Sequence, residues 1–293
     1  MKSLIQLLRP YQWVKNAFVF LPLFFGRHML DIDFVIPSVV AFAAFCLSAS
    51  GIYCLNDVID ADKDRQHPRK CHRPVASGAV SKSAGLVLAL LLEFAAFALA
   101  GLTLVASQAM DLSVVLGFYL ALNILYCIRL KHVAIIDIFI VATGFVLRIF
   151  AGGTATGIVL SHWIVLVTFL LALLLKLAKT RDDVVIYQET GVMLRQSVAR
   201  YNLSFVNQTI GILASVLIVC YIMYTVSDEV VERVGSPYLY VTSVFVLAGV
   251  IRYLQLTMVD GRSGSPTRVL LHDHFIHLCI LGWGLVFFFL LYC

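Results

Sequence analysis

Nine apolar segments, each long enough to cross a lipid bilayer as a helix, recur along this chain of 293 residues. A bilayer-spanning helix needs about 20 mostly apolar residues. The nine segments lie at 14–30, 34–56, 84–106, 112–130, 134–156, 160–179, 204–226, 237–257 and 271–292. A soluble protein with a very large core is the alternative, but only 13% of the residues are charged, about half the usual fraction in soluble domains. We therefore predict an all-α polytopic membrane protein with nine transmembrane helices, forming one domain over residues 1–293.

Lysine and arginine fall almost entirely on one side of these predicted spans. Nineteen of the 22 lie on the side of the N-terminus, whereas Arg27 and Arg233 lie opposite and Arg148 lies within a span. Because positive residues concentrate in cytoplasmic loops, we predict a cytoplasmic N-terminus and a C-terminus outside. The same positive side favours an anionic ligand. Nucleic acid is an improbable partner, since there is no soluble domain with a basic, aromatic-bearing surface.

An acidic motif, Asn56-Asp57-x-x-Asp60-x-x-x-Asp64, closes the second predicted span. Aspartates spaced by three and seven residues lie on one face of a helix. Carboxylates gathered near a membrane repel one another unless a cation neutralises them, and hard oxygen ligands of this kind suit Mg²⁺, which also bridges to substrate phosphates. We predict that the three aspartates are metal ligands and catalytic residues, with Asn56 supporting them. A plain charged helix end is the alternative.

The acidic motif opens the first of two long polar segments, 57–83 and 180–203, which we predict to be cytoplasmic active-site loops. The stretch from Arg65 to Gly78 alternates cations with helix breakers, and arginine forks suit phosphate oxygens. Arg73 and His67 are therefore candidate substrate-binding residues. An ordinary surface histidine is the alternative for His67.

A mixed patch of charges joins the sixth predicted span to the second polar segment. It reads Lys176-x-x-Lys179-x-Arg181-Asp182-Asp183. Lys179, Arg181 and Asp182 are candidate substrate-binding residues on the same side as the acidic motif. An ordinary helix end with snorkelling lysines is the alternative.

Two charges, Asp137 and Arg148, lie inside the fifth predicted span. Charges at such depth are costly and mark functional sites. Eleven residues separate the two, about 16 Å along a helix, so they cannot pair directly. We expect Arg148 to meet another anion within the bundle, either as a structural ion pair or in a substrate site. Further substrate-binding candidates begin the first span or end the fourth: Lys15, Asn16, Tyr126 and Lys131.

The acidic motif, followed by Arg73-Pro74-x-x-Ser77-Gly78, resembles the UbiA superfamily of intramembrane prenyltransferases. The resemblance implies nine transmembrane helices around a central cavity that opens to the cytoplasmic side. It also implies two aspartate-rich motifs that hold Mg²⁺ and a diphosphate.

Further motifs are similar to the decaprenyl-phosphate phosphoribosyltransferase branch of that superfamily. They are Arg9-Pro10-x-Gln12-Trp13-x-Lys15-Asn16, Gly144-Phe145-x-Leu147-Arg148-x-x-Ala151-Gly152 and Ser265-Pro266-Thr267-x-Val269-Leu270-Leu271-x-Asp273. The branch implies transfer of 5-phosphoribose from phosphoribosyl pyrophosphate to a polyprenyl phosphate, with release of pyrophosphate. It further implies an enzyme of the bacterial cytoplasmic membrane, acting in cell-wall biosynthesis, and a homo-oligomer such as a trimer.

One departure separates this chain from aromatic prenyltransferases, whose second motif has the form D-x-x-x-D. Lys179-Thr180-Arg181 stands where an early aspartate would align, and a site that exchanges carboxylate for lysine should hold fewer metals and more anions. Two rival functions remain: an aromatic prenyltransferase using polyprenyl diphosphate, and a transporter using Asp137 and Arg148 as an ion path. Metal-dependent release of pyrophosphate would separate either enzyme from a transporter.

Overall fold

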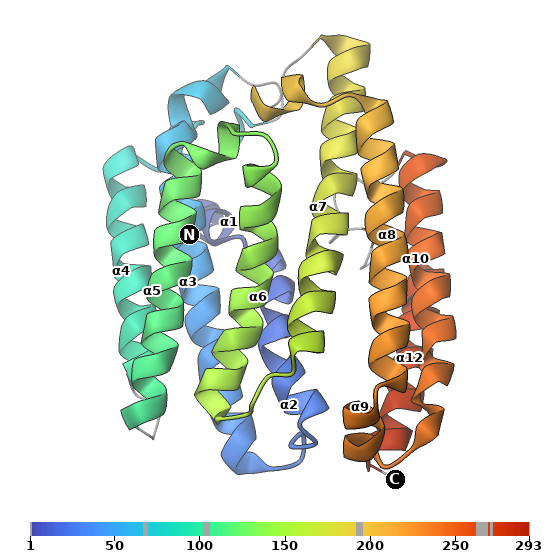
Figure 1. Ribbon diagram of the computed structural model, residues 1–293. Coiled ribbons are helices and arrows are strands. Elements are labelled where there is room, and N and C mark those ends of the chain that lie inside the picture. Colours follow the sequence, from blue (N-terminus) through green and yellow to red (C-terminus); the bar gives the residue numbers. More distant parts are fainter. Residues whose placement is uncertain are drawn as a thin grey trace. The chain divides into compact units, whose positions relative to one another are not determined.

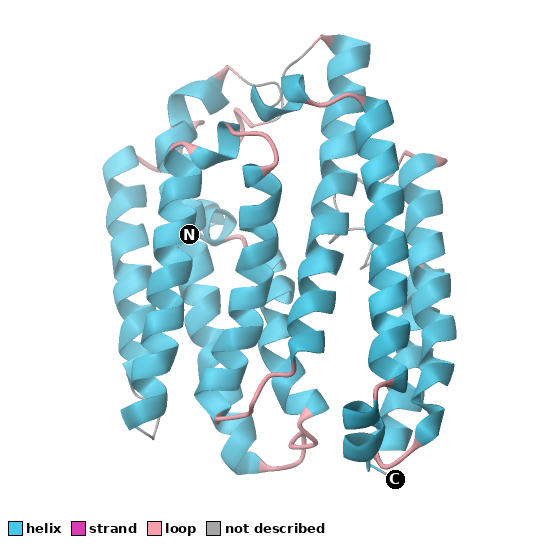
Figure 2. Ribbon diagram, in the orientation of Figure 1, coloured by secondary structure: helices cyan, strands magenta, loops and turns pink. Residues whose placement is uncertain are grey.

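Helices make up the regular structure of this protein, which we describe from a computed structural model (Figure 1). The structure describes residues 2–66, 70–101, 106–191, 196–261, 269 and 272–292. Within these residues every regular element is an α-helix or a 3-10 helix and no strand occurs (Figure 2). The predicted all-α class is confirmed. The candidate residue His67 lies outside the described residues.

The helices gather into two compact units. The first comprises Met1–Lys131 and Gly144–Leu160, and the second comprises His132–Thr143 and Ser161–Cys293. Helix α6 (Ile136–Thr156) therefore gives its first turns to the second unit and its remainder to the first. The single domain expected over 1–293 stays a prediction.

Helix α3 (Ile32–Arg65) is the helix against which most of the first unit packs. It contacts α1, η1, α2, α4 and α5, and α4 also contacts α5. The bounds of these elements are α1 Lys2–Leu8, η1 Pro10–Phe20, α2 Leu21–Phe25, α4 Lys82–Gly101 and α5 Ala106–Ile128. Small residues of α3 such as Ala41 and Ala44 are fully buried beside Phe45, so the neighbouring helices can approach closely.

The 3-10 helix η1 runs antiparallel along α3 in a regular register. Phe20 lies against Phe42 with ring centroids 5.2 Å apart. Two hydrogen bonds follow toward the N-terminus, from Asn16 Nδ2 to Cys46 Sγ (3.1 Å) and from Trp13 Nε1 to Ser50 Oγ (3.0 Å). The register brings the N-terminal end of η1 to the acidic end of α3.

The first predicted span, 14–30, differs from the structure. In its place stand η1 and the five-residue helix α2, which ends at Phe25. Pro22 lies in the first turn of α2, and proline cannot donate the backbone hydrogen bond that would continue the preceding helix. The chain therefore begins a new short helix there instead of one long span.

The second unit is built from α7 (His162–Thr190), with α8 packed beside it and α10 and α12 beyond. The bounds of its remaining elements are η3 Gln196–Arg200, α8 Leu203–Val226, α9 Asp228–Val234, η4 Pro237–Thr242, α10 Ser243–Met258 and α12 His274–Tyr292. Asp273 stands at the start of α12 and accepts a hydrogen bond from the Ile276 amide (2.9 Å). Hydrogen bonding to Arg252 holds the pKa of Asp273 below its ordinary value.

Both polar segments begin as helix, which corrects the expectation that they are loops throughout. Helix α3 continues to Arg65 and α7 continues to Thr190. The α7 helix ends at Gly191, whose φ of 67° is the left-handed conformation that favours glycine. The acidic motif and the mixed patch therefore lie on the rigid ends of long helices.

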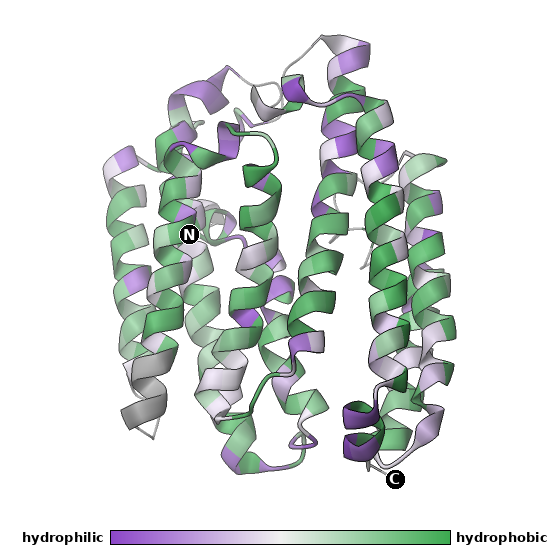
Figure 3. Cartoon of the chain, viewed as in Figure 1, coloured by the Kyte–Doolittle hydropathy of each residue, from purple (hydrophilic) through white to green (hydrophobic). Residues whose placement is uncertain are grey.

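Seven helices among the described residues are long and apolar enough to cross a membrane. Their apolar colouring runs along most of α8, α10 and α12, while polar residues gather at helix ends (Figure 3). Large apolar side chains such as Phe94 on α4 and Leu285 on α12 are 74% and 70% exposed. Such exposure is costly in water and shows that this is an integral membrane protein. The count of nine spans stays a prediction.

The close contact between α6 and η1 gives a testable prediction. A Cβ atom added at Gly152 would clash with the backbone oxygen of Val19, so Gly152→Ala forces the two backbones apart. We expect the free energy of unfolding to fall by about 1–3 kcal/mol, measured by thermal unfolding in detergent. Gly117→Ala on α5 is the control, because an added Cβ there meets no atom within 4 Å. An equal loss in both variants would contradict the packing described.

Candidate active site

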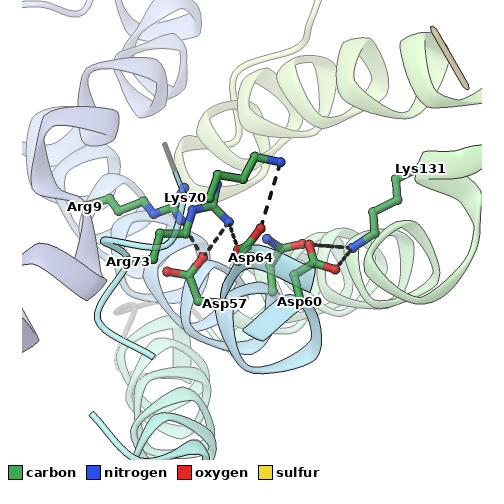
Figure 4. Close-up of polar contacts among 8 residues, drawn as sticks. Arg9, Asp57, Asp60, Asp64, Lys70, Arg73 and Lys131 are labelled. Atoms are coloured by element: carbon green, nitrogen blue, oxygen red, sulfur yellow. Dashed lines mark hydrogen bonds and ion pairs between the residues drawn. The ribbon is translucent and has the colours of Figure 1, made fainter. Parts of the chain in front are cut away.

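Two aspartates on the last turns of α3 share one arginine (Figure 4). Asp57 and Asp64 are seven residues apart, so they project from nearly the same side of the helix. Both are buried, with 1% and 4% of their surface exposed. Arg73 Nη1 donates to Asp57 Oδ1 at 3.1 Å and to Asp64 Oδ2 at 2.7 Å. The acidic motif and the basic segment after it therefore lie in direct contact.

Two further cations surround this pair of carboxylates. Arg9 donates to Asp57 from the N-terminal end of η1, and Lys70 Nζ lies 4.0 Å from Asp64 Oδ1. Burial alone would lower the pKa of Arg9, but the charge of the Asp57 carboxylate raises that pKa above its ordinary value. The guanidinium of Arg9 is therefore permanently charged at this site.

Arg9 is a site residue that the sequence reasoning missed. The sequence places Arg9 in the N-terminal motif but does not indicate a role for it. Its backbone has φ 53° and ψ 57°, a left-handed conformation that is unfavourable for a residue with a side chain. Strain of this kind is found where a functional position requires it. The sequence did contain a signal for Arg9. It belongs to the same motif as the candidates Lys15 and Asn16, which follow it by six and seven positions.

Asp60 has a different partner from the other two aspartates. At about 100° per residue, Asp60 projects roughly 60° away from Asp57 around the helix. Lys131 Nζ donates to its two carboxylate oxygens at 2.6 and 2.8 Å, and lies 3.4 Å from Asn56 Oδ1. The structure thus brings Lys131 to the acidic motif. Asp62 lies off this face, exposed, and pairs with Lys82 at 2.7 Å.

One carboxylate oxygen of the site lacks a partner, which suits a cation. Asp57 Oδ2 is buried and has no hydrogen-bond partner, although a buried polar atom without a partner costs about 1–3 kcal/mol. A divalent ion beside it would remove that cost, and carboxylate oxygens are what Mg²⁺ prefers. Among the described residues no three acidic, histidine or cysteine side chains converge. If a metal ion binds here, Asp57 and Asp64 would supply two ligands, and Asp60 would have to leave Lys131 to supply a third.

Arg148 is surrounded by neutral groups, which corrects the expectation of an anionic partner within the bundle. Nε donates to Asn16 Oδ1 at 2.7 Å, Nη2 donates to the Tyr119 hydroxyl at 3.0 Å, and Nη1 donates to the Gly144 carbonyl. The guanidinium also lies over three aromatic rings, with centroid distances of 5.8, 5.0 and 5.4 Å to Phe45, Tyr119 and Phe145. No carboxylate of the described residues pairs with it.

Asp137 and Lys176 form a buried ion pair in the second unit. Lys176 Nζ donates to Asp137 Oδ2 at 2.9 Å and to Thr180 Oγ1 at 3.2 Å. Tyr201 adds its hydroxyl 3.4 Å from Asp137 Oδ1. A structural ion pair was one of the two alternatives predicted for the charges within the fifth span. Asp137 forms such a pair with Lys176 of α7.

The remaining candidates of the mixed patch lie on α7. Arg181 donates to Asn207 Oδ1 at 2.8 Å and to the Thr257 carbonyl at 2.9 Å, so it ties α7 to α8 and α10. Lys179 precedes Arg181 by two residues, and Asp182 directly follows it. Tyr126, on α5, packs against the core of the first unit. The substrate-binding roles of all four residues stay predictions.

The fold and the acidic site define an intramembrane protein of the UbiA type. The structure is similar to that of a UbiA homologue from Archaeoglobus fulgidus solved with GPP and Mg²⁺, with a TM-score of 0.71 at 16% identity over 97% of this chain and 99% of that one. Residues 18–278 match the UbiA prenyltransferase family, and the chain belongs to this family.

Two relatives with the same name align over nearly the whole chain. The decaprenyl-phosphate phosphoribosyltransferase of Mycolicibacterium smegmatis is 32% identical over 96% of this chain and 90% of its own length. The decaprenyl-phosphate phosphoribosyltransferase of Corynebacterium glutamicum is 33% identical over 96% of this chain and 84% of its own length.

The buried pair of Asp137 and Lys176 gives a prediction about stability. Removing one partner of a buried ion pair leaves an uncompensated charge and costs about 3–5 kcal/mol, whereas replacing both by apolar residues is often neutral. We expect Lys176→Met to lower the melting temperature of the detergent-solubilised protein strongly. The double variant Lys176→Met with Asp137→Leu should recover most of the loss. A double variant that is less stable than the single one would show that the pair is not the source of the effect.

Proposed function

We propose that this protein is a pentosyltransferase that moves 5-phosphoribose from phosphoribosyl pyrophosphate to a polyprenyl phosphate of the decaprenyl type, releasing pyrophosphate. The observation that carries the proposal is the alignment of 96% of the chain with two relatives that bear the name of this activity. The buried carboxylates with cations around them support it, because such a site suits a metal-bound diphosphate.

The residues of the acidic motif have distinct parts in this proposal. Asp57, Asp60 and Asp64 would hold Mg²⁺, and Asn56 would support them by hydrogen bonding. Bound there, the ion supplies Lewis-acid neutralisation of the charge that builds on the pyrophosphate leaving group. Arg9 and Arg73, both paired with Asp57, would be positioned to contact pyrophosphate oxygens once a cation takes their place.

The reaction needs no general base on the protein. The bond from ribose C1 to the pyrophosphate oxygen breaks, and a bond from C1 to an oxygen of the acceptor phosphate forms. That phosphate is already an anion, so no proton has to be removed. Attack from the ring face opposite the leaving group inverts the configuration at C1. Holding the two reactants in line is therefore the main task of the protein.

The membrane setting completes the proposal. We place the acidic end of α3 on the cytoplasmic side of a bacterial cytoplasmic membrane, with the N-terminus in the cytoplasm and the C-terminus outside. Nine helices would surround a central cavity that opens to that side, capped by the segments 57–83 and 180–203. The charged sugar donor cannot cross the bilayer unaided, whereas the acceptor is a lipid. A homo-oligomer such as a trimer fits the same setting.

Turnover by purified protein tests the proposal. With labelled phosphoribosyl pyrophosphate, polyprenyl phosphate and Mg²⁺, we expect a lipid-linked phosphoribose. Asp57→Asn and Asp64→Asn should lower the rate by about a hundredfold or more, because each removes several kcal/mol of metal-based stabilisation. Asp62→Asn is the matched control, since Asp62 lies on the same helix end but points into solvent and pairs with Lys82.

Two outcomes would contradict the proposed function. Prenylation of an aromatic acid from polyprenyl diphosphate, without transfer of phosphoribose, would favour the aromatic prenyltransferase. Near-normal rates in Asp57→Asn would show that the metal site is elsewhere.

A further inference from the structure

A buried arginine without an acidic partner stands out in the first unit. Arg148 is 5% exposed, and its three hydrogen bonds go to an amide, a hydroxyl and a carbonyl oxygen. A guanidinium has five N–H donors, so one N–H on each terminal nitrogen remains. Two adjacent N–H groups of this kind match two oxygens of a phosphate or carboxylate.

A second cation, Lys15, lies in the same part of the unit. It directly precedes Asn16, the residue that accepts from Arg148. The charges of Arg148 and Arg9 both act on the Lys15 ammonium. Among the residues described, Lys15 makes no hydrogen bond or ion pair, so two neighbouring cations lack a counter-charge. Arg9 differs from them, because Asp57 neutralises it.

Such an arrangement is costly unless an anion joins it. Taking an unpaired charge out of water into a low-dielectric interior costs far more than its hydrogen bonds to neutral groups return. An ionisable side chain at membrane depth therefore indicates a functional site. The aromatic rings around Arg148 contribute about 2 kcal/mol or more in a desolvated site, but they are neutral and supply no counter-charge.

Arg148 is separate from the carboxylate site. Asn16 contacts Cys46 and Arg148 lies over Phe45, and these α3 residues precede Asp57 by 11 and 12 positions. That separation is about 16–18 Å along the helix axis. A pyrophosphate held at Asp57 and Asp64 is too short to contact both sites, so the anion at Arg148 must be another group.

We propose that Arg148 and Lys15 form a second anion site, which takes a phosphate monoester. The inference rests on the proposed function for the identity of that group, which is either the 5-phosphate of the sugar donor or the phosphate of the lipid acceptor. Both are dianionic phosphate monoesters. Arg148 supplies the bidentate fork, Lys15 supplies the second positive charge, and Asn16 fixes the plane of the guanidinium as a positioning residue.

Binding of a soluble phosphate monoester tests the site without turnover. Ribose 5-phosphate is titrated into the detergent-solubilised full-length protein, with a chelator present, and followed by thermal stabilisation. We expect Lys15→Gln and Arg148→Gln each to raise the apparent Kd about tenfold or more. Lys82→Gln removes an equal charge from the exposed pair with Asp62 and should bind as the wild type does.

The two variants protect the test from a folding failure. Lys15 makes no hydrogen bond or ion pair among the described residues, so Lys15→Gln carries the result where Arg148→Gln fails to fold. Unchanged affinity in Lys15→Gln would overturn the proposal. Lost binding in this variant upholds the anion site even where no phosphoribosyl transfer is found, so the two proposals fail separately.

Steady-state kinetics then identifies the source of the phosphate. A rise in the KM for phosphoribosyl pyrophosphate in Lys15→Gln, with an unchanged KM for polyprenyl phosphate, assigns the site to the donor. The reverse pattern assigns it to the lipid acceptor. A fall in kcat with both KM values unchanged would show that the residue does not bind substrate and would overturn the proposal.

Discussion

The need to balance charge in a low-dielectric interior governs the first unit of this protein. Asp57 and Asp64 are nearly inaccessible to solvent, and each is held by cations that arrive from other segments: Arg9 from the N-terminus, and Lys70 and Arg73 from the turn after α3. Unpaired, such buried carboxylates would destabilise the fold. A divalent cation bound at these carboxylates would meet the same demand for positive charge.

The N-terminal segment places charged and polar side chains at successive positions along α3. The antiparallel register sets Arg9 beside Asp57 and Asn16 beside Cys46, so one short stretch serves both the carboxylate site and the cations at Arg148. Gly152 allows α6 to approach this stretch closely, which brings Arg148 within reach of Asn16. The close packing of Gly152 against Val19 thereby helps to position the buried Arg148 guanidinium.

The sequence predicted the parts of the fold and site that depend on local pattern. Long apolar segments implied membrane helices, and the spacing of the aspartates implied a common helix face. It could not predict the partners that come from distant positions, because nothing local encodes them. Lys131 is 71 residues from Asp60, and Arg148 is 132 residues from Asn16. Helical geometry alone predicts that Asp60 projects away from Asp57. That Asp60 pairs with Lys131 could not be predicted, because it depends on where Lys131 lies in the fold.

The central claim is that the carboxylates at the end of α3 hold the diphosphate of the donor through a divalent cation. Calorimetric titration of phosphoribosyl pyrophosphate into the full-length protein, with and without Mg²⁺, tests it most directly. The account predicts binding that requires Mg²⁺, is competed by pyrophosphate and disappears in Asp57→Asn. Binding of equal strength in the presence of a chelator, or in Asp57→Asn, would contradict it.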